Sequence, residues 1–422
     1  MKQPGLFDPI IPDDFTESLF QAYFDCRRNK RNTLNALKFE LHFEKYIFEL
    51  ADDIRNGTYQ PGRSIAFIVT KPVKREVFAA QFRDRVVHHW LIRKLNPFFE
   101  NAFMEDAYAC RTGKGTHFGI RRMHDFIQQC AQENEGEAYV LKLDIRGFFM
   151  HISRPLLFDK LEDFISKKDK VEDKLFLLDM ARRIIFNDPT KNCFIKGNKS
   201  LWDDLPKDKS LFHSPSECGL PIGNLTSQVF ANFYLNDFDH FIKEKLHIKY
   251  YGRYVDDFVL VHPDRKYLSG LIPIIENYLK TNLKLQLHPK KRYLQHHSKG
   301  LAFLGVMIKP NRIYVGNRIK SNFFTVLKQQ NEVVSTSSVD KSVVMQFVSR
   351  MNSYLGIMKH YHTFRLRQHI IQKKLNPGWW KFIFVKSQFL SVGRLKWARY
   401  VVLVTFCKKG LVGGLKTNTV AV

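Results

Sequence analysis

The chain has 422 residues, of which 44% are hydrophobic, so it can bury the cores of about two or three domains or of one large multi-lobed enzyme. Its 67 Lys and Arg exceed its 41 Asp and Glu, and the resulting formal net charge of +26 predicts a polyanionic partner such as nucleic acid. The six cysteines form no CxxC pair, prolines and acids interrupt the N-terminus, and the longest late apolar run, Tyr400–Cys407, is far shorter than the about 20 residues of a membrane helix. These features argue against zinc ribbons, disulfide frameworks, a signal peptide and a membrane span, and they predict a soluble cytoplasmic protein.

Apolar spacing predicts mixed helices and strands in the first part of the chain. In order, we expect a helical region at 33–56, two short strands around a basic turn at 63–82, a helix from Phe82 that ends near Pro97, a further helix that opens near 110–126, and a strand at 138–149 that breaks at Gly147.

The second part of the chain begins with a polar, breaker-rich stretch at 187–218, which predicts a long loop or a small subdomain. After it we expect a helix containing Phe230 and Phe238 and capped by Thr226 or Ser227, a strand–turn–strand unit at 250–262, a helix near 266–282, strands at 283–291 and 300–315, and basic helices from about 320 onward.

The C-terminal tail concentrates positive charge. From Lys341 to Val422 there are 15 Lys and Arg and no Asp or Glu. The aromatic residues among these cations predict either a surface for base stacking and phosphate contact or a core with basic edges. They are Trp379, Trp380, Phe382, Phe384, Phe389 and Trp397.

Three aspartates lie at predicted strand ends. Asp144 closes the strand at 138–149, and Asp256 and Asp257 lie between the two strands at 250–262. A hairpin turn alone explains the adjacent Asp256 and Asp257. The further carboxylate of Asp144, at the end of another strand, favours a site shared by all three in one antiparallel sheet. Clustered carboxylates repel unless a cation compensates them, and hard oxygen ligands select Mg²⁺. Two such ions about 3.5 to 4 Å apart stabilise the attacking and leaving oxygens of an in-line displacement, so the pattern predicts phosphoryl transfer.

Five motifs resemble the palm motifs of reverse transcriptases and follow the same order. They are LKLDIRGFF at 141–149, GLPIGNLTSQ at 219–228, YVDD at 254–257, LQLHPKK at 285–291 and FLGVMI at 303–308, and REVFAAQFRDRVVHHWL at 75–91 resembles the finger segment of the bacterial enzymes. The resemblance covers about residues 60 to 310. It implies an α+β right-hand polymerase fold, with fingers and part of the palm at 1–135, an antiparallel-sheet palm at 136–312 that carries a finger-like insertion at about 155–215, and a basic helical thumb and extension at 313–422.

The same resemblance implies an RNA-directed DNA polymerase that uses two Mg²⁺ ions, with Mn²⁺ as an alternative. Asp144 and Asp256 would bind metal with Asp257 as a third carboxylate, and the Ile145 carbonyl would complete the coordination. Lys291 best matches the lysine that protonates pyrophosphate, and Lys290 is its near rival.

Further residues would select the nucleotide. Phe149 matches the steric gate that excludes a ribose 2′-hydroxyl, although a core aromatic is the simpler explanation outside the motif. Lys71, Lys74 and Arg75 lie in the matching basic hairpin and would neutralise the triphosphate, unless they form a solvated turn. Arg83 and Arg85 could bind template or pair with Asp84 or Glu76.

The loop at 219–228 departs from the usual QGxxxSP motif. Ile222 replaces Gln, Gly223 is kept, and Gln228 replaces Pro; without the family this stretch would be a capping loop. The IGxxxSQ variant resembles the reverse transcriptases of diversity-generating retroelements, as do DKSLF at 208–212 and RMNSYLG at 350–356. That family copies a template-repeat RNA with frequent errors at adenines, and the cDNA replaces a variable repeat in a target gene. It implies an RNA template, a DNA or RNA primer, dNTPs and a small basic accessory protein as partners, and no membrane.

Two alternatives stay open. One is another bacterial reverse transcriptase, of the retron, group II intron or phage-defence type, and the other is an inactive nucleic-acid-binding scaffold. The three intact carboxylates argue against a scaffold. The acid-free tail excludes an added ribonuclease H or integrase module after Asp340, because both need carboxylates for metal, and it predicts a surface that grips the template–primer duplex.

Overall fold

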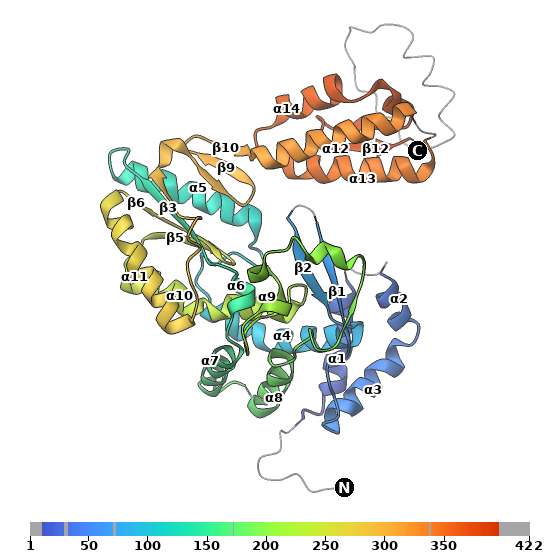
Figure 1. Cartoon of the computed structure of the whole chain (residues 1–422), viewed down its shortest axis with the longest axis vertical. Coiled ribbons are helices and arrows are strands. Elements are labelled where there is room, and N and C mark those ends of the chain that lie inside the picture. Colours follow the sequence, from blue (N-terminus) through green and yellow to red (C-terminus); the bar gives the residue numbers. More distant parts are fainter. Residues whose placement is uncertain (1–10, 29–32, 71–72, 172, 337–338, 396–422) are drawn as a thin grey trace. The chain divides into compact units, whose positions relative to one another are not determined.

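The computed structural model describes residues 11–28, 33–70, 73–171, 173–336 and 339–395 (Figure 1). The chain divides into two compact units, Met1–His296 and His297–Val422. The larger unit carries two sheets and a set of helices. Its helices are α1 (Phe15–Arg27), α2 (Leu34–Glu40), α3 (Phe43–Arg55), α4 (Phe82–Ala102), α5 (Thr116–Glu133), α6 (Phe148–His151), α7 (Arg154–Ser166), α8 (Lys174–Ile185), α9 (Leu225–Tyr234), α10 (Asn236–His240), η4 (Phe241–Lys245) and α11 (Arg265–Leu283).

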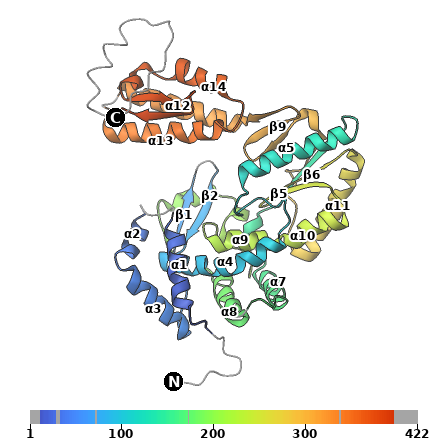
Figure 2. The same ribbon diagram turned by 180° about the vertical axis from the view of Figure 1, so that it is seen from behind.

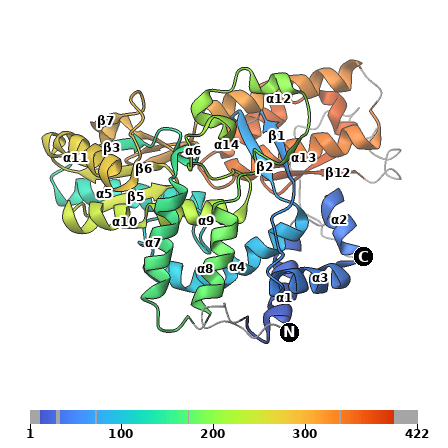
Figure 3. The same ribbon diagram turned by 60° about the horizontal axis from the view of Figure 1, so that its bottom comes forward.

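The larger of these sheets has the strand order β5-β6-β3-β7, and every neighbouring pair is antiparallel. Its strands are β3 (Tyr139–Asp144), β5 (Tyr250–Tyr254), β6 (Asp257–His262) and β7 (Tyr293–His296). Helix α5 packs on β5 and β6, whereas α11 packs on β3, β6 and β7. Figure 1 shows the sheet between these two helices, and Figure 3 shows α11 beside β3 and β7. Because both faces are covered, Val140, Leu141 and Leu143 are all buried and β3 is almost continuously apolar until Asp144.

The second sheet has the order β2-β1-β4. Strands β1 (Ser64–Val69) and β2 (Arg75–Ala79) form an antiparallel hairpin, and β4 (Cys193–Ile195) adds to β1 in parallel. The hairpin confirms the two strands predicted around a basic turn. The stretch at 187–218 is an ordered subdomain rather than a plain loop, since it contains β4 and three 3-10 helices, η1 (Lys199–Trp202), η2 (Lys207–Lys209) and η3 (Leu211–His213).

Helix α4 corrects one expectation, because it continues through Pro97 to Ala102 instead of ending there. A proline removes one backbone hydrogen bond, but Leu95 and Phe99 on either side are fully buried. Figure 2 shows α4 below α9 and beside α1; both helices pack against it. Tertiary packing therefore holds the helix together across its proline.

Two further local predictions are wrong. Asn224, not Thr226 or Ser227, precedes the first turn of α9, and its side chain accepts a hydrogen bond from Ala80 N–H at 3.3 Å instead of capping the helix. Residues 283–291 do not form a strand: one isolated bridge joins Ile145 and Leu287, and the next strand is β7. The alternating Leu residues there are buried without strand pairing, since Leu285 and Leu287 belong to the main hydrophobic core.

The smaller unit contains a meander, β8 (Leu301–Phe303), β9 (Val306–Lys309) and β10 (Arg312–Val315), with strand order β10-β9-β8. Its helices are α12 (Asn317–Thr336), α13 (Lys341–Met358), α14 (Phe364–His369) and η6 (Ile370–Lys374), followed by η7 (Pro377–Lys381). The tail is not purely helical, since β11 (Ile383–Lys386) and β12 (Ser391–Arg394) pair as a hairpin.

The tail aromatics in the described residues contribute to a core. Trp379 is fully buried and stacks on Phe347 with ring centroids 3.8 Å apart. Trp380, Phe382 and Phe389 pack against the same cluster, whereas Phe384 is exposed. Trp397 lies outside the described residues. Within the part of the chain that the structure describes, no helix is both long and apolar enough to cross a membrane.

Candidate active site

The three predicted aspartates meet at one end of the β5-β6-β3-β7 sheet. Asp144 is the last residue of β3 and pairs with Asp257, the first residue of β6. Asp256 lies in the turn between β5 and β6, and its carbonyl accepts a hydrogen bond from Ile145 N–H at 3.1 Å. The antiparallel register therefore brings acids more than a hundred residues apart in the chain to one edge, as the sequence predicts.

The turn that carries Asp256 is strained. Val255 has φ +59°, a left-handed conformation that β-branched residues rarely adopt. The Val255 carbonyl accepts a hydrogen bond from Arg253 Nη1 at 3.0 Å, and the Arg253 side chain is completely buried. Such a conformation persists only when contacts with the surrounding structure hold it in place.

Arg253 is the centre of a buried polar network. Its Nε and Nη2 donate to the two carboxylate oxygens of Asp239 at 2.7 and 2.5 Å, and its Nη1 also donates to Asn232 Oδ1 at 3.0 Å. Tyr251 Oη donates to Asp239 at 2.6 Å. Both members of the ion pair have no exposed side-chain surface. A bidentate, fully satisfied pair of this kind fixes the backbone on which Asp256 lies.

Two lysines compensate the aspartates. Lys291 Nζ lies 2.9 Å from both carboxylate oxygens of Asp144, and Lys142 Nζ lies 2.9 Å from Asp257 Oδ2. Of the two candidate lysines, Lys291 is thus the one that contacts the Asp144 carboxylate. The backbone N–H of Lys290 donates to His288 Nδ1. Within the described ranges, no three His, Cys, Asp or Glu side chains gather closely enough to form a ready-made metal cage.

The donor set nevertheless fits Mg²⁺. Asp257 Oδ1 is buried and has no hydrogen-bond partner among the described residues, so one hard oxygen acceptor is unsatisfied at the sheet edge. Mg²⁺ is commonly held by one or two protein carboxylates together with substrate phosphates, not by a complete protein cage. Two carboxylates on adjoining strand ends meet that description.

Burial raises the pKa of Asp256, and with the added effect of the negative charges of Asp144 and Asp257 this pKa is about 6. Burial also raises the pKa of Asp257, against the opposing effect of the Lys142 ammonium. The repulsion expected for clustered carboxylates is therefore present at this edge, and a cation would relieve it.

The loop after Leu220 is joined to the segment that follows Asp144. Phe149 is partly buried and its carbonyl accepts a hydrogen bond from Leu220 N–H at 2.8 Å. The Ile222 carbonyl accepts from Phe78 N–H at 2.8 Å, so the loop is attached to β2. Gly223 has φ +126°, and a Cβ there would lie 2.8 Å from the Phe78 carbonyl oxygen, which explains the need for glycine. Gln228 is exposed, and its Oε1 lies 3.4 Å from Cys110 Sγ.

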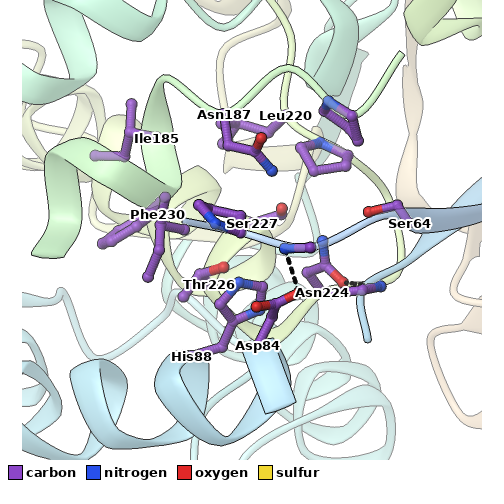
Figure 4. Close-up of a pocket in the computed structure, with 16 residues that line it drawn as sticks. Ser64, Asp84, His88, Ile185, Asn187, Leu220, Asn224, Thr226, Ser227 and Phe230 are labelled. Carbon is purple, nitrogen blue, oxygen red and sulfur yellow. Dashed lines mark hydrogen bonds between the residues drawn. The ribbon is translucent and has the colours of Figure 1, made fainter. Parts of the chain in front are cut away.

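This loop helps to line a small cavity of about 20 Å³, drawn in Figure 4, whose walls carry both apolar and polar side chains. Asp84, on α4, accepts hydrogen bonds from Gly62 N–H at 2.9 Å and Tyr59 Oη at 3.1 Å. The volume suits about one water molecule. The cavity is too small for a nucleotide, and we treat it as part of the packing beneath the loop.

The predicted basic residues have mixed positions. Lys71 lies outside the described residues, Lys74 Nζ is 3.8 Å from Asp204 Oδ2, and Arg75 is exposed at the start of β2. Arg83 pairs with Asp53, and Arg85 Nε donates to the Ala80 carbonyl at 2.9 Å. Arg83 therefore pairs with Asp53 instead of Asp84 or Glu76, although its charge lowers the pKa of Asp84.

Sequence reasoning missed Lys142 and Arg253. Lys142 lies two residues before Asp144 and hence on the same face of β3, which was a usable signal. Arg253 is a lone charge within the apolar strand that precedes Asp256, and a buried charge requires a partner. Its partner Asp239 lies in another element, and no local pattern identifies it.

Carboxylates at the ends of adjoining antiparallel strands are typical of the palm of a nucleotidyl-transferring polymerase with the right-hand fold. A family model described as "Reverse transcriptase (RNA-dependent DNA polymerase)" matches residues 73–308, more than half of the chain. The chain belongs to this family of RNA-directed DNA polymerases.

Curated relatives are distant. Protein YkfC of Escherichia coli is 24% identical over 61% of this chain and 69% of its own length. The "Putative COX1/OXI3 intron 2 protein" of Saccharomyces cerevisiae is 22% identical over 71% of this chain, and the "Uncharacterized 91 kDa protein in cob intron" of Schizosaccharomyces pombe is 25% identical over 51%. The chain spans only 38% and 22% of these two intron proteins.

Among solved structures, apo telomerase from Candida tropicalis is similar, with a TM-score of 0.45 and 12% identity over 74% of this chain and 59% of that one. A Candida albicans telomerase complexed with a fragment of telomeric RNA has a TM-score of 0.42 and 11% identity, over 80% of this chain and 62% of that one.

Proposed function

We propose that this protein extends a primer with deoxynucleotides on an RNA template. The supporting observation is the convergence of Asp144, Asp256 and Asp257 at one end of the palm sheet. The 3′-hydroxyl of the primer loses its proton to water, its oxygen bonds to the α-phosphorus of the incoming nucleotide, the bond from that phosphorus to the bridging oxygen breaks, and pyrophosphate leaves. Lys291 lies at this edge and supplies the proton that pyrophosphate needs.

Asp144, Asp256 and the Ile145 carbonyl would hold two Mg²⁺ ions, with Asp257 in support and Mn²⁺ as an alternative. The ions would stabilise the charge that develops on the attacking and leaving oxygens. The residues of the chain do the positioning: the Arg253 network holds Asp256, and Lys142 holds Asp257.

Nucleotide selection is assigned to Phe149, Ile222, Gly223 and Gln228. Phe149 would exclude the 2′-hydroxyl, and the basic residues Lys71, Lys74 and Arg75 would contact the triphosphate. The proposed arrangement has three parts: fingers at 1–135, a palm at 136–312, and a basic thumb and extension at 313–422. The acid-free stretch after Asp340 suits backbone contacts with an RNA–DNA duplex.

Within the family we favour the diversity-generating retroelement type, in which cDNA from a template-repeat RNA carries errors at adenines and a small basic accessory protein takes part. Ile222 and Gln228 support this assignment, because a Gln that usually lines the pocket is replaced by an apolar side chain. The intron-encoded names of two relatives favour a second candidate, an intron-type reverse transcriptase.

Sequencing of cDNA made by the purified chain separates the two. We expect substitutions to concentrate opposite template adenines, and Ile222→Gln to reduce that bias while extension continues. Errors spread evenly over the four template bases would favour the intron-type enzyme and leave the polymerase assignment intact.

A further inference from the structure

Residues 201–213, which we call the pocket wall, are attached to strand β2 through one buried carboxylate. Glu76 is 1% exposed and accepts hydrogen bonds from Trp202 Nε1 at 2.7 Å, Ser210 Oγ at 2.8 Å and Leu211 N–H at 2.5 Å. Three donors from two ends of the segment thus converge on a single side chain. A buried carboxylate that loses such partners is costly, so this attachment is fixed in the folded chain.

The other side of the pocket wall lies against the turn at residues 145–147, which follows Asp144. Arg146 Nε donates to Asp208 Oδ2 at 3.1 Å, and Arg146 is the second residue after Asp144. A Cβ at Gly147, which has φ +52°, would lie 2.6 Å from the Asp208 carbonyl oxygen. Backbone of the wall therefore contacts backbone of the turn, with no room for a side chain between them.

Apolar contacts place the wall behind the proposed sugar gate. Leu211 belongs to a small cluster with Phe78, Ala66 and Met150, and both Phe149 and Ile222 pack against that cluster. Phe212 also contacts Phe78, with ring centroids 5.5 Å apart. Two of the four residues assigned to nucleotide selection, Phe149 and Ile222, therefore share one apolar support, and Leu211 of the wall is part of it.

We propose that the pocket wall sets selection of deoxynucleoside over ribonucleoside triphosphates, and that Glu76 is the positioning residue that holds it. This inference rests on the proposed polymerase function and extends it to a segment with no assigned role. Glu76 does not touch substrate; it keeps Leu211 behind Phe149, so that the aromatic ring cannot yield to a 2′-hydroxyl.

Glu76→Gln tests the inference, because it keeps the size of the side chain but leaves one amide donor facing the donors of the wall. We expect the ratio of kcat/KM for deoxynucleotide to kcat/KM for ribonucleotide to fall about tenfold or more, while KM for the template–primer stays unchanged. Asp208→Asn, which weakens the exposed tie to Arg146, should lower the ratio less. Asp179→Asn, in an ion pair with Arg183 on α8, is the matched control and should leave it unchanged.

Binding of dATP and of ATP to a complex with a chain-terminated primer is measured in parallel, with thermal unfolding to check the fold. An unchanged ratio in a folded Glu76→Gln variant would overturn the role of the wall. A general loss of both nucleotides in equal proportion would also overturn it, because it would show a merely structural role. If wild type binds deoxynucleotide selectively but never incorporates it, the proposed function fails, and the binding ratio of the variant still decides the inference.

Discussion

At the scale of single residues, the site depends on compensated charge. Asp144 and Asp257 each face a lysine, and Asp256 lies in a turn that a buried arginine holds through the Val255 carbonyl. The two lysines are partly exposed, whereas Arg253 and Asp239 are fully buried. Loss of a lysine therefore changes local charge, but loss of Arg253 removes the support of the turn.

Arg253→Met should destabilise the fold by about 3–5 kcal/mol, because it leaves Asp239 as an unpaired buried charge. Arg253→Lys keeps the charge but cannot form the bidentate contact with Asp239. We therefore expect it to be more stable than Arg253→Met, but to have a lower apparent affinity for Mg²⁺ than wild type. Urea unfolding and metal titration of primer extension measure the two effects. Arg183→Met, at a partly exposed ion pair, is the control and should cost far less; equal losses in both Met variants would contradict the account.

At the scale of elements, the sheet edge is assembled by strand pairing, and the loop after Leu220 is held by β2 and α4. Asp84 joins α4 to the segment before β1, since it accepts hydrogen bonds from Tyr59 and Gly62 beside the cavity of Figure 4. Burial raises its pKa above the ordinary value, against the opposing effects of those hydrogen bonds.

Asp84→Asn should therefore change how stability depends on pH. A carboxyl whose folded pKa is raised contributes stability that is present below the unfolded pKa and is lost as pH rises through the folded pKa. We expect the free energy of unfolding of wild type relative to Asp84→Asn to be larger at about pH 4 than at about pH 7. Urea unfolding at both pH values measures it, and a difference that is the same at both, or larger at about pH 7, would contradict the raised pKa.

Several elements with strong periodicity were predictable, whereas the alternating Leu residues at 283–291 and the elements determined by distant contacts were not. Strands β3, β5 and β6 and the turn at Asp256 follow from apolar runs that end in acids. Helix α4 passes Pro97 because its neighbours are buried, which local propensity does not show. For the stretch at 187–218, which contains the pocket wall, the sequence predicts either a long loop or a small subdomain. It cannot decide between them, because the wall is held by Glu76, which is 134 residues away from Ser210.

At the scale of the whole molecule, the charge of +26 is the dominant property. Cations that contact phosphates release counterions from the nucleic acid, so binding should weaken steeply with salt. We expect the affinity for an RNA–DNA hybrid to fall about a hundredfold or more between about 50 and about 200 mM salt. Fluorescence anisotropy measures it, and an affinity independent of salt would contradict a polyanionic partner.

The central claim is that the aspartates at the palm edge catalyse RNA-directed DNA synthesis, and primer extension tests it most directly. Purified wild type and Asp256→Asn are compared on an RNA template with a primer, Mg²⁺ and dNTPs, beside Asp163→Asn as a surface control. We predict that wild type and the control extend the primer, while Asp256→Asn loses about a thousandfold or more of the rate and stays folded. Equal extension by wild type and Asp256→Asn would contradict the account.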